Sequence, residues 1–213
     1  MKNAILIILL ITSISCNDKR IDKFWFLEID QDYNRVKGVF ENYVDFFPKE
    51  SNCYSLNCTW SLDQTDEYNL KVVFEFNDEM FNEEKRKIEE DAIAKYLAGN
   101  DSVLVLNRFS TNKNYGYPDK SEIERELIEQ DHFKEFKPIP NFSNFSAYNT
   151  NTTVCKLPKD FSIYVLESKP GIFLKENQLT DGEYMPKVWK HGYSKGVAIS
   201  SKRKEMIYWV IIW

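Results

Sequence analysis

The stretch near the end of the printed sequence constrains the fold most. Residues 207–213 read Ile-Tyr-Trp-Val-Ile-Ile-Trp, an unbroken apolar run. Successive side chains of a strand point to opposite faces, so this run predicts a central strand, 206–213, that is covered on both faces. The charged residues 202–204 separate it from a second apolar stretch, 197–200, and together they predict a closing hairpin. Because a buried strand is not dispensable, we expect truncation here to be destructive.

The rest of the chain alternates between helical and strand patterns. Apolar residues at three- and four-residue spacing predict helices at 31–47, 79–98 and 120–131, with Asn77 capping the second. Apolar runs predict strands at 59–62, 68–76, 102–108, 161–167 and 172–175, of which 102–108 is a candidate for the sheet centre. Helices and strands are interleaved early and strands dominate late. We therefore expect an α+β single domain with a mostly antiparallel sheet and two or three helices.

The first 16 residues have the pattern of an export signal. Lys2 precedes an apolar run, residues 4–11, and the small polar step Thr12-Ser13-Ile14-Ser15 leads to Cys16. A positive start, a short apolar core and a small-residue cleavage site describe a secretory signal. The run is shorter than the roughly 20 residues that cross a bilayer. We therefore expect a leader that is removed, not a membrane span.

A cysteine placed directly after Ser13-Ile14-Ser15 resembles the signal of bacterial lipoproteins, although that family prefers Leu where this chain has Ser13. The resemblance implies that the Cys16 thiol is acylated and becomes the new N-terminus. It implies a signal peptide at 1–15, a lipidated cysteine and tether at 16–23, and a globular domain at 24–213. The implied location is the cell envelope, lipid-anchored at the outer membrane on its periplasmic or surface face. The alternative is plain secretion with cleavage at the same place.

The four cysteines are Cys16, Cys53, Cys58 and Cys155. If Cys16 is acylated, three thiols remain outside the reducing cytosol, and the close pair Cys53–Cys58 is the favoured disulfide. Under plain secretion the count is even, and Cys16 can pair with Cys155 as well. We expect no metal site, because there is no second close cysteine pair and neither histidine is near in sequence. No cofactor is expected.

Charge and composition exclude several classes of protein. Loss of Lys2 leaves 27 basic against 33 acidic side chains, a formal charge of −6 on the 198 residues after the leader. This acidic balance does not indicate a nucleic-acid-binding surface, and the sequence contains no basic amphipathic helix that would bind anionic lipid. The hydrophobic fraction of 43% and the aromatic fraction of 15% argue against disorder.

One segment is a candidate for ligand or partner contact. Residues 189–196 place Trp189, His191, Tyr193 and two lysines between glycines, just before the closing hairpin. Aromatic and cationic side chains clustered on a loop suit such contacts. The alternative is a tight turn whose Trp189 and Tyr193 complete the core, since aromatic residues dominate cores as well as interfaces.

No catalytic residue is expected. A cysteine nucleophile needs a base within hydrogen-bond reach, and Cys155 with His132 or His191 is the only pairing in the sequence. The residues around Cys155 match no nucleophile signature. The seven glycines are scattered and form no phosphate-binding loop. The alternative is an envelope hydrolase that uses Cys155 or scattered carboxylates with His191.

The sequence therefore predicts a membrane-anchored envelope lipoprotein that acts by binding. The membrane is contacted through acylated Cys16, and the partner is an envelope protein, an incoming toxin or a glycan, not a nucleic acid. A plainly secreted, disulfide-linked protein is the remaining alternative.

Overall fold

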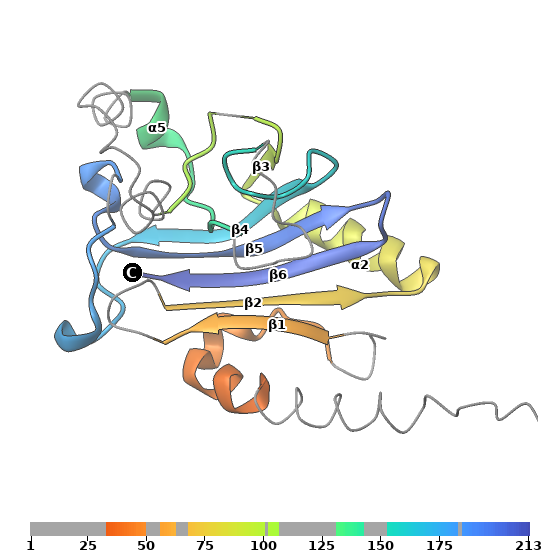
Figure 1. The fold of residues 1–213 in the computed structure, drawn as a ribbon, viewed down its shortest axis with the longest axis horizontal. Coiled ribbons are helices and arrows are strands. Elements are labelled where there is room, and N and C mark those ends of the chain that lie inside the picture. Colours follow the sequence, from red (N-terminus) through yellow and green to blue (C-terminus); the bar gives the residue numbers. More distant parts are fainter. Residues whose placement is uncertain are drawn as a thin grey trace, which may run out of the picture.

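A six-stranded antiparallel sheet forms the centre of the computed structural model (Figure 1), which describes residues 33–49, 56–62, 68–100, 102–106, 131–142, 153–182 and 185–213. The strands are β1 (Leu56–Ser61), β2 (Tyr68–Glu75), β3 (Ala94–Leu97), β4 (Ser162–Pro170), β5 (Gly192–Ser200) and β6 (Glu205–Ile212). Their order across the sheet is β1-β2-β6-β5-β4-β3, with antiparallel pairing throughout.

Helices are few and short beside this sheet. The described residues form α-helix at 33–40, in α2 (Asp78–Asp91) and in α5 (Asp131–Glu135). Three 3₁₀ turns add η1 (Glu41–Val44), η3 (Glu176–Gln178) and η4 (Lys187–Trp189). The predicted α+β class, with a mostly antiparallel sheet, is confirmed. In the described part of the chain, no helix is long and apolar enough to cross a membrane.

The apolar run at 206–213 forms the central strand β6, as predicted. β6 lies between β2 and β5, and all its residues after Glu205 are buried. Its side chains alternate between two separate hydrophobic cores. Met206, Tyr208, Val210 and Ile212 belong to one core, and Ile207, Trp209 and Ile211 to the other. The closing hairpin with β5 is confirmed and is longer than expected.

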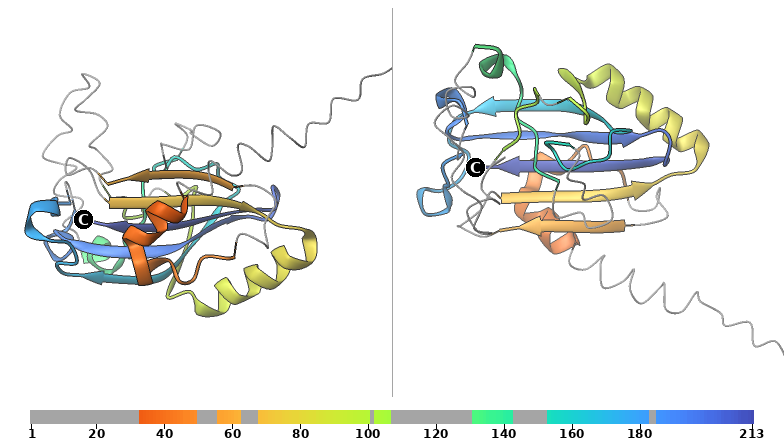
Figure 2. Two further views of the ribbon diagram at one scale, coloured as in Figure 1. Left: turned by 90° about the horizontal axis from the view of Figure 1, so that it is seen from below. Right: turned by 45° about the horizontal axis from the view of Figure 1, so that its top comes forward.

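The first helical segment and α2 cover one face of the sheet, which we call the helix face, and loops together with the short helix α5 cover the other, the loop face (Figure 2). The helix-face core contains the apolar stripe of the first helical segment. Val36, Phe40, Val44 and Phe47 are all buried there, at the spacing that predicted a helix. The chain between β3 and β4 supplies much of the loop-face core, including residues 103–106 and Ile139.

Helix α2 begins where the sequence predicts and ends earlier. The Asn77 side chain accepts a hydrogen bond of 2.9 Å from the Met80 backbone N–H, which is a helix N-cap. Phe81 and Ile88 form the buried face of the helix. The expected extension to residue 98 is wrong, because Ala94–Leu97 forms edge strand β3 against β4. Alternating burial in β3 and backbone pairing outweighed the helical spacing of these residues.

Two other strand predictions are wrong. Residues 103–106 are buried, but they belong to the loop-face core and make one isolated bridge, Val105 with Ile139. An apolar run of this length cannot be distinguished from buried irregular chain by periodicity. Residues 172–175 leave the sheet, since Gly171 has a φ of +138° and turns the chain away. The predicted helix at 120–131 lies outside the described residues except at its last position.

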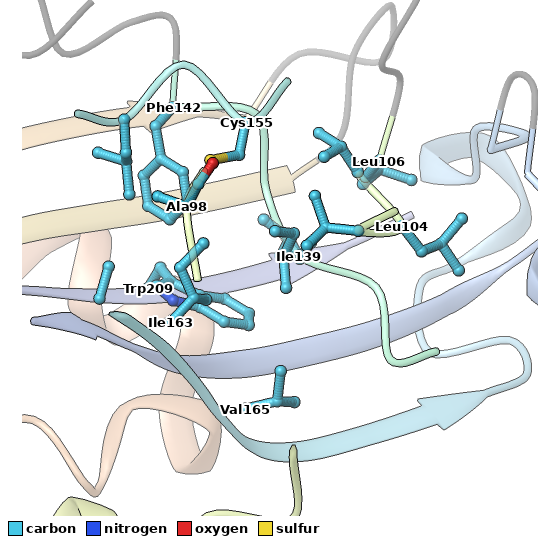
Figure 3. Close-up of a cluster of buried hydrophobic side chains, with 14 of the residues drawn as sticks. Ala98, Leu104, Leu106, Ile139, Phe142, Cys155, Ile163, Val165 and Trp209 are labelled. Carbon is cyan, nitrogen blue, oxygen red and sulfur yellow. The ribbon is translucent and has the colours of Figure 1, made fainter. Parts of the chain in front are cut away.

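The Trp209 ring lies among the buried side chains of the loop-face core (Figure 3) and requires a glycine opposite it. Trp209 on β6 pairs in register with Gly196 on β5. A Cβ atom on Gly196 would lie 2.6 Å from Cζ2 of the Trp209 ring and would clash with the Tyr164 carbonyl oxygen. The indole ring therefore occupies the space that any other side chain at 196 would need.

Candidate interaction site

The structure separates the three residues that the sequence singled out. Trp189 is buried in the loop-face core and Tyr193 in the helix-face core, with exposures of 3% and 5%. His191 lies between them where the chain enters β5. These residues therefore do not form one exposed aromatic patch. Their burial agrees with the alternative in which Trp189 and Tyr193 complete the core.

Trp189 helps to close one end of the sheet. Its ring lies 6.1 Å from that of Trp213, measured between centroids, and its carbonyl oxygen accepts a 2.9 Å hydrogen bond from the Trp213 indole N–H. Gly192 and Trp213 also exchange two backbone hydrogen bonds of 3.1 and 3.0 Å. Trp189 thus has a packing role that leaves little of its surface for a ligand.

His191 fastens the connection between β4 and β5. Its Nδ1 lies 3.0 Å from the Thr180 carbonyl oxygen, and its Nε2 lies 3.3 Å from a carboxylate oxygen of Asp181. Both ring nitrogens therefore face acceptors. The Gly182 backbone N–H donates a further bond of 2.8 Å to the Lys190 carbonyl. These contacts hold residues 180–182 against residues 190–191, and neither ring nitrogen is directed at an open site.

Tyr193 meets a charged group that the sequence did not indicate. Its hydroxyl donates a 2.5 Å hydrogen bond to the carboxylate of Glu167. The same carboxylate is 2.6 Å from Nζ of Lys169 and 2.9 Å from Nζ of Lys195. An irregularity in β4 between Val165 and Glu167 shifts the register next to this position. We call Tyr43, Glu167, Lys169, Tyr193 and Lys195 the tyrosine cluster.

Aromatic rings surround the Tyr193 side chain. The Tyr43 ring packs edge-on at 5.0 Å and the Phe173 ring at 4.6 Å, both between centroids. Nζ of Lys195 lies 5.5 Å from the centre of the Phe46 ring, within the range of a cation–π contact. The first helical segment, the β4–β5 connection and β5 thus meet at this one tyrosine.

Glu167, Tyr193 and Tyr43 each keep one protonation state at neutral pH. Hydrogen bonds from Lys169 and Tyr193 lower the pKa of Glu167 to about 2. Burial, with the neighbouring Glu167 carboxylate, raises the pKa of Tyr193 to about 12. Burial and the same carboxylate also raise the pKa of Tyr43. None of these three groups changes protonation near pH 7, so the arrangement favours recognition over proton transfer.

Cys155 has the surroundings of a structural cysteine (Figure 3). It is fully buried in the loop-face core, and its thiol lies 3.7 Å from the Ala98 carbonyl oxygen. Burial raises the pKa of the thiol, which disfavours the nucleophilic thiolate. The side chain of His132 lies outside the described residues, so that pairing is not tested.

The remaining cysteine predictions stay predictions. Cys58 is half-buried and packs against the helix-face core. Its expected partner Cys53 and the expected lipidation site Cys16 both lie outside the described residues. Within the described ranges, no group of three or more His, Cys, Asp or Glu side chains is placed to hold a metal ion.

The sequence indicates the tyrosine cluster only weakly. Glu167 and Lys169 are two positions apart, as are Tyr193 and Lys195. Residues two apart share one face of a strand, so each pair would be expected to lie together. The pairing of β4 with β5, which brings the two pairs together, is visible only in the structure.

Comparisons with protein-family models, with curated proteins and with solved structures find no match to this chain.

Proposed function

We propose that this protein is a membrane-anchored envelope lipoprotein whose α+β domain acts as a binding module. The anchor is supported by the leader, in which an apolar run and a small-residue step precede Cys16. More than one acyl chain would make the attachment stable. Acylated Cys16 would hold the domain at the membrane, and the domain would engage an envelope protein, an incoming toxin or a glycan.

The tyrosine cluster is the observation that supports binding. Its carboxylate and one of its lysines are accessible, with side-chain exposures of 33% for Glu167 and 61% for Lys169. Their positions are held by Tyr193, Lys195 and the surrounding rings. Charged groups fixed before binding lose little conformational entropy when a partner docks.

An envelope hydrolase has less support. The Cys155 thiol is buried with a raised pKa, and both ring nitrogens of His191 face the acceptors described above. Neither residue is suited to nucleophilic or general-base chemistry in this arrangement.

Intact mass of protein purified from its native membrane fraction tests the anchor. A mass that begins at Cys16 and includes acyl chains supports it, and a mass without lipid overturns it. Two thiols that appear only on reduction would support the Cys53–Cys58 bridge.

Site-specific photo-crosslinking in intact cells tests the binding role. A crosslinking residue in place of Lys169 should give a discrete adduct, which Glu167→Gln should weaken because the carboxylate is lost. The same residue in place of Lys202, on the exposed β5–β6 turn, is the matched control. Adducts of equal yield at both positions, or none at 169, would contradict a binding role for the cluster.

A further inference from the structure

Strand β3 is an open edge of the sheet. It pairs with β4 on one side, and no strand of the described ranges pairs with its other side, which is the upper edge of the sheet in Figure 1. The Ala98 backbone N–H donates a 3.0 Å hydrogen bond to the Phe161 carbonyl on the β4 side. Alternate residues of an antiparallel strand direct their backbone groups to opposite sides, so Lys95 and Leu97 direct theirs away from β4. The Leu97 carbonyl accepts a 2.9 Å bond from Asn100, which leaves the N–H of Leu97 and both groups of Lys95 as a template for a further strand.

Two aliphatic side chains lie on one face of this edge. From Ile93 to Leu97 exposed residues alternate with half-buried ones, and the half-buried Ala94 and Tyr96 pack on the loop-face core. Strand alternation therefore places the exposed side chains together on the opposite face. Ile93 is 54% exposed and Leu97 is 59% exposed. A strand paired with β3 would cover both.

Each end of this edge carries one charge that has no ion pair in the described part of the chain. Asp91, the exposed last residue of α2, lies at the N-terminal end. Lys159 lies at the C-terminal end, where its Cγ would be 3.4 Å from a Cβ atom on Gly99. The carboxylates next to them in sequence, Glu90 and Asp160, are both paired with arginines. The edge is thus negative at one end and positive at the other.

We propose that β3 pairs with β3 of a second copy of this chain, antiparallel and about a two-fold axis perpendicular to the sheet. Each N-terminal end then meets the C-terminal end of the other copy, so two contacts between Asp91 and Lys159 form by symmetry. Parallel pairing would instead bring like charges together. Ile93 and Leu97 of the two copies become neighbours across the new strand pair, where apolar side chains stabilise a sheet.

Lys95 does not prevent this pairing. A lysine on an edge strand commonly blocks association, because its charge would be buried. The Lys95 ammonium, however, lies 4.0 Å from the Glu89 carboxylate and 4.9 Å from the centre of the Tyr164 ring. Its charge is therefore partly compensated within its own copy. Since Tyr164 is on β4, the ammonium is also drawn over the sheet and away from the open edge.

A second copy fits this edge better than other occupants. Open N–H and C=O groups at a sheet edge are satisfied by an extended backbone, which a lipid or a glycan does not have. An unrelated strand would have to carry the opposite order of charges, whereas a second copy supplies it by symmetry. Because β3 has only four residues, we expect a contact below the roughly 1,200 Å² of stable interfaces, and therefore a weak, reversible dimer. The inference does not depend on the proposed anchor, although two copies on one membrane would meet more often.

Zero-length crosslinking tests the pairing. Isotope-labelled and unlabelled full-length protein are mixed and treated with a carbodiimide, which joins a carboxylate to an amine, and the peptides are identified by mass spectrometry. We expect a crosslink between Asp91 and Lys159 in which one peptide is labelled and the other is not. Within one copy the length of β3 separates these residues by about 20 Å, which is too far for a zero-length link.

Charge reversal supplies matched variants. Asp91→Lys or Lys159→Asp should lower dimerisation about tenfold in sedimentation measurements, because each turns two attractive contacts into repulsive ones. The double reversal should restore dimerisation. Leu97→Ser should weaken it, whereas Ile172→Ser, at the most exposed aliphatic residue in the described part of the chain, should not. Lys202→Glu, at an exposed lysine of the β5–β6 turn, is the charge control and should also have no effect.

Several outcomes would overturn the proposal. These are the absence of the mixed-label crosslink, a double reversal that dimerises no better than the single ones, and equal effects of Leu97→Ser and Ile172→Ser. In intact cells, links from Lys159 to another envelope protein without links between copies would overturn it in favour of a different partner strand.

Discussion

The Tyr208 hydroxyl, on the central strand, donates a 2.9 Å hydrogen bond to the Glu84 carboxylate on α2. Tyr208 is fully buried, and the side chain of Glu84 is only 22% exposed. A second tyrosine on the same face, Tyr164 of β4, donates a 2.8 Å bond to Glu89, one turn further along α2. Two hydroxyl–carboxylate pairs thus fix α2 on the sheet, in addition to its apolar contacts.

Removal of the Tyr208 hydroxyl should weaken the docking of α2. We expect Tyr208→Phe to lower the free energy of unfolding by about 1.5–3 kcal/mol, as for a hydrogen bond to a charged group. Chemical denaturation of Tyr208→Phe, Glu84→Ala and the double variant forms a cycle that isolates the pair. Strictly additive effects of the two substitutions would contradict the interaction.

Gly196→Ala should be strongly destabilising. The new methyl group would overlap the Trp209 ring and the Tyr164 carbonyl, so the hairpin must shift. We expect a loss of about 1–3 kcal/mol, typical of overpacked cores. Gly38→Ala is the matched control, since Gly38 lies in the first helix with open space around it. That control should stabilise the protein by about 0.5–1 kcal/mol, and a Gly196 variant as stable as wild type would refute the packing argument.

Glu167 should contribute to acid sensitivity. Its pKa falls from 4.5 to about 2 in the folded protein, so its charged form is favoured by folding. The stabilisation is present above about pH 4.5 and is lost as the pH falls from there towards 2. Glu167→Gln removes this titration, so its stability should change less than that of wild type over that interval. Thermal unfolding of both proteins between pH 2 and 7 makes the comparison, and parallel profiles would count against it.

Cys155 should resist thiol reagents in the folded protein. Its thiol is fully buried and its pKa is raised, so both access and the thiolate fraction are low. Peptide mass spectrometry after alkylation should show Cys155 unmodified in buffer and modified in denaturant. Rapid alkylation of the native protein would instead indicate an accessible thiol and reopen the question of a cysteine nucleophile.

The sequence predicts those elements whose apolar pattern is both long and regular. The first helix, the β1–β2 hairpin and the β5–β6 hairpin have such patterns and are found near their expected positions. Residues 94–97 also matched a helical spacing, but β4 offered an open edge that they could pair with. A local sequence pattern cannot predict this pairing, because the pairing depends on the position of a strand 65 or more residues away.

The candidate site was only partly predictable for the same reason. The clustering of aromatic and cationic side chains along residues 189–196 is what indicates Trp189, His191 and Tyr193 as contact residues. Trp189 belongs to the 3₁₀ turn η4 and His191 precedes β5, so only Tyr193 lies on a strand. Proximity along the chain therefore did not become proximity in space. Glu167 joins Tyr193 through strand pairing across 26 residues and beside a register shift in β4.

The pairing of β2 with β6 has a consequence for how the chain reaches its destination. Glu75 and Glu205 are partners in register, yet they lie 130 positions apart. During synthesis β2 must therefore wait for a strand made much later, and such distant pairings close slowly because of their loop entropy. A chain whose central strands pair late remains unfolded for longer. That delay suits the proposed export, because a chain that is still unfolded can pass through a narrow translocation channel.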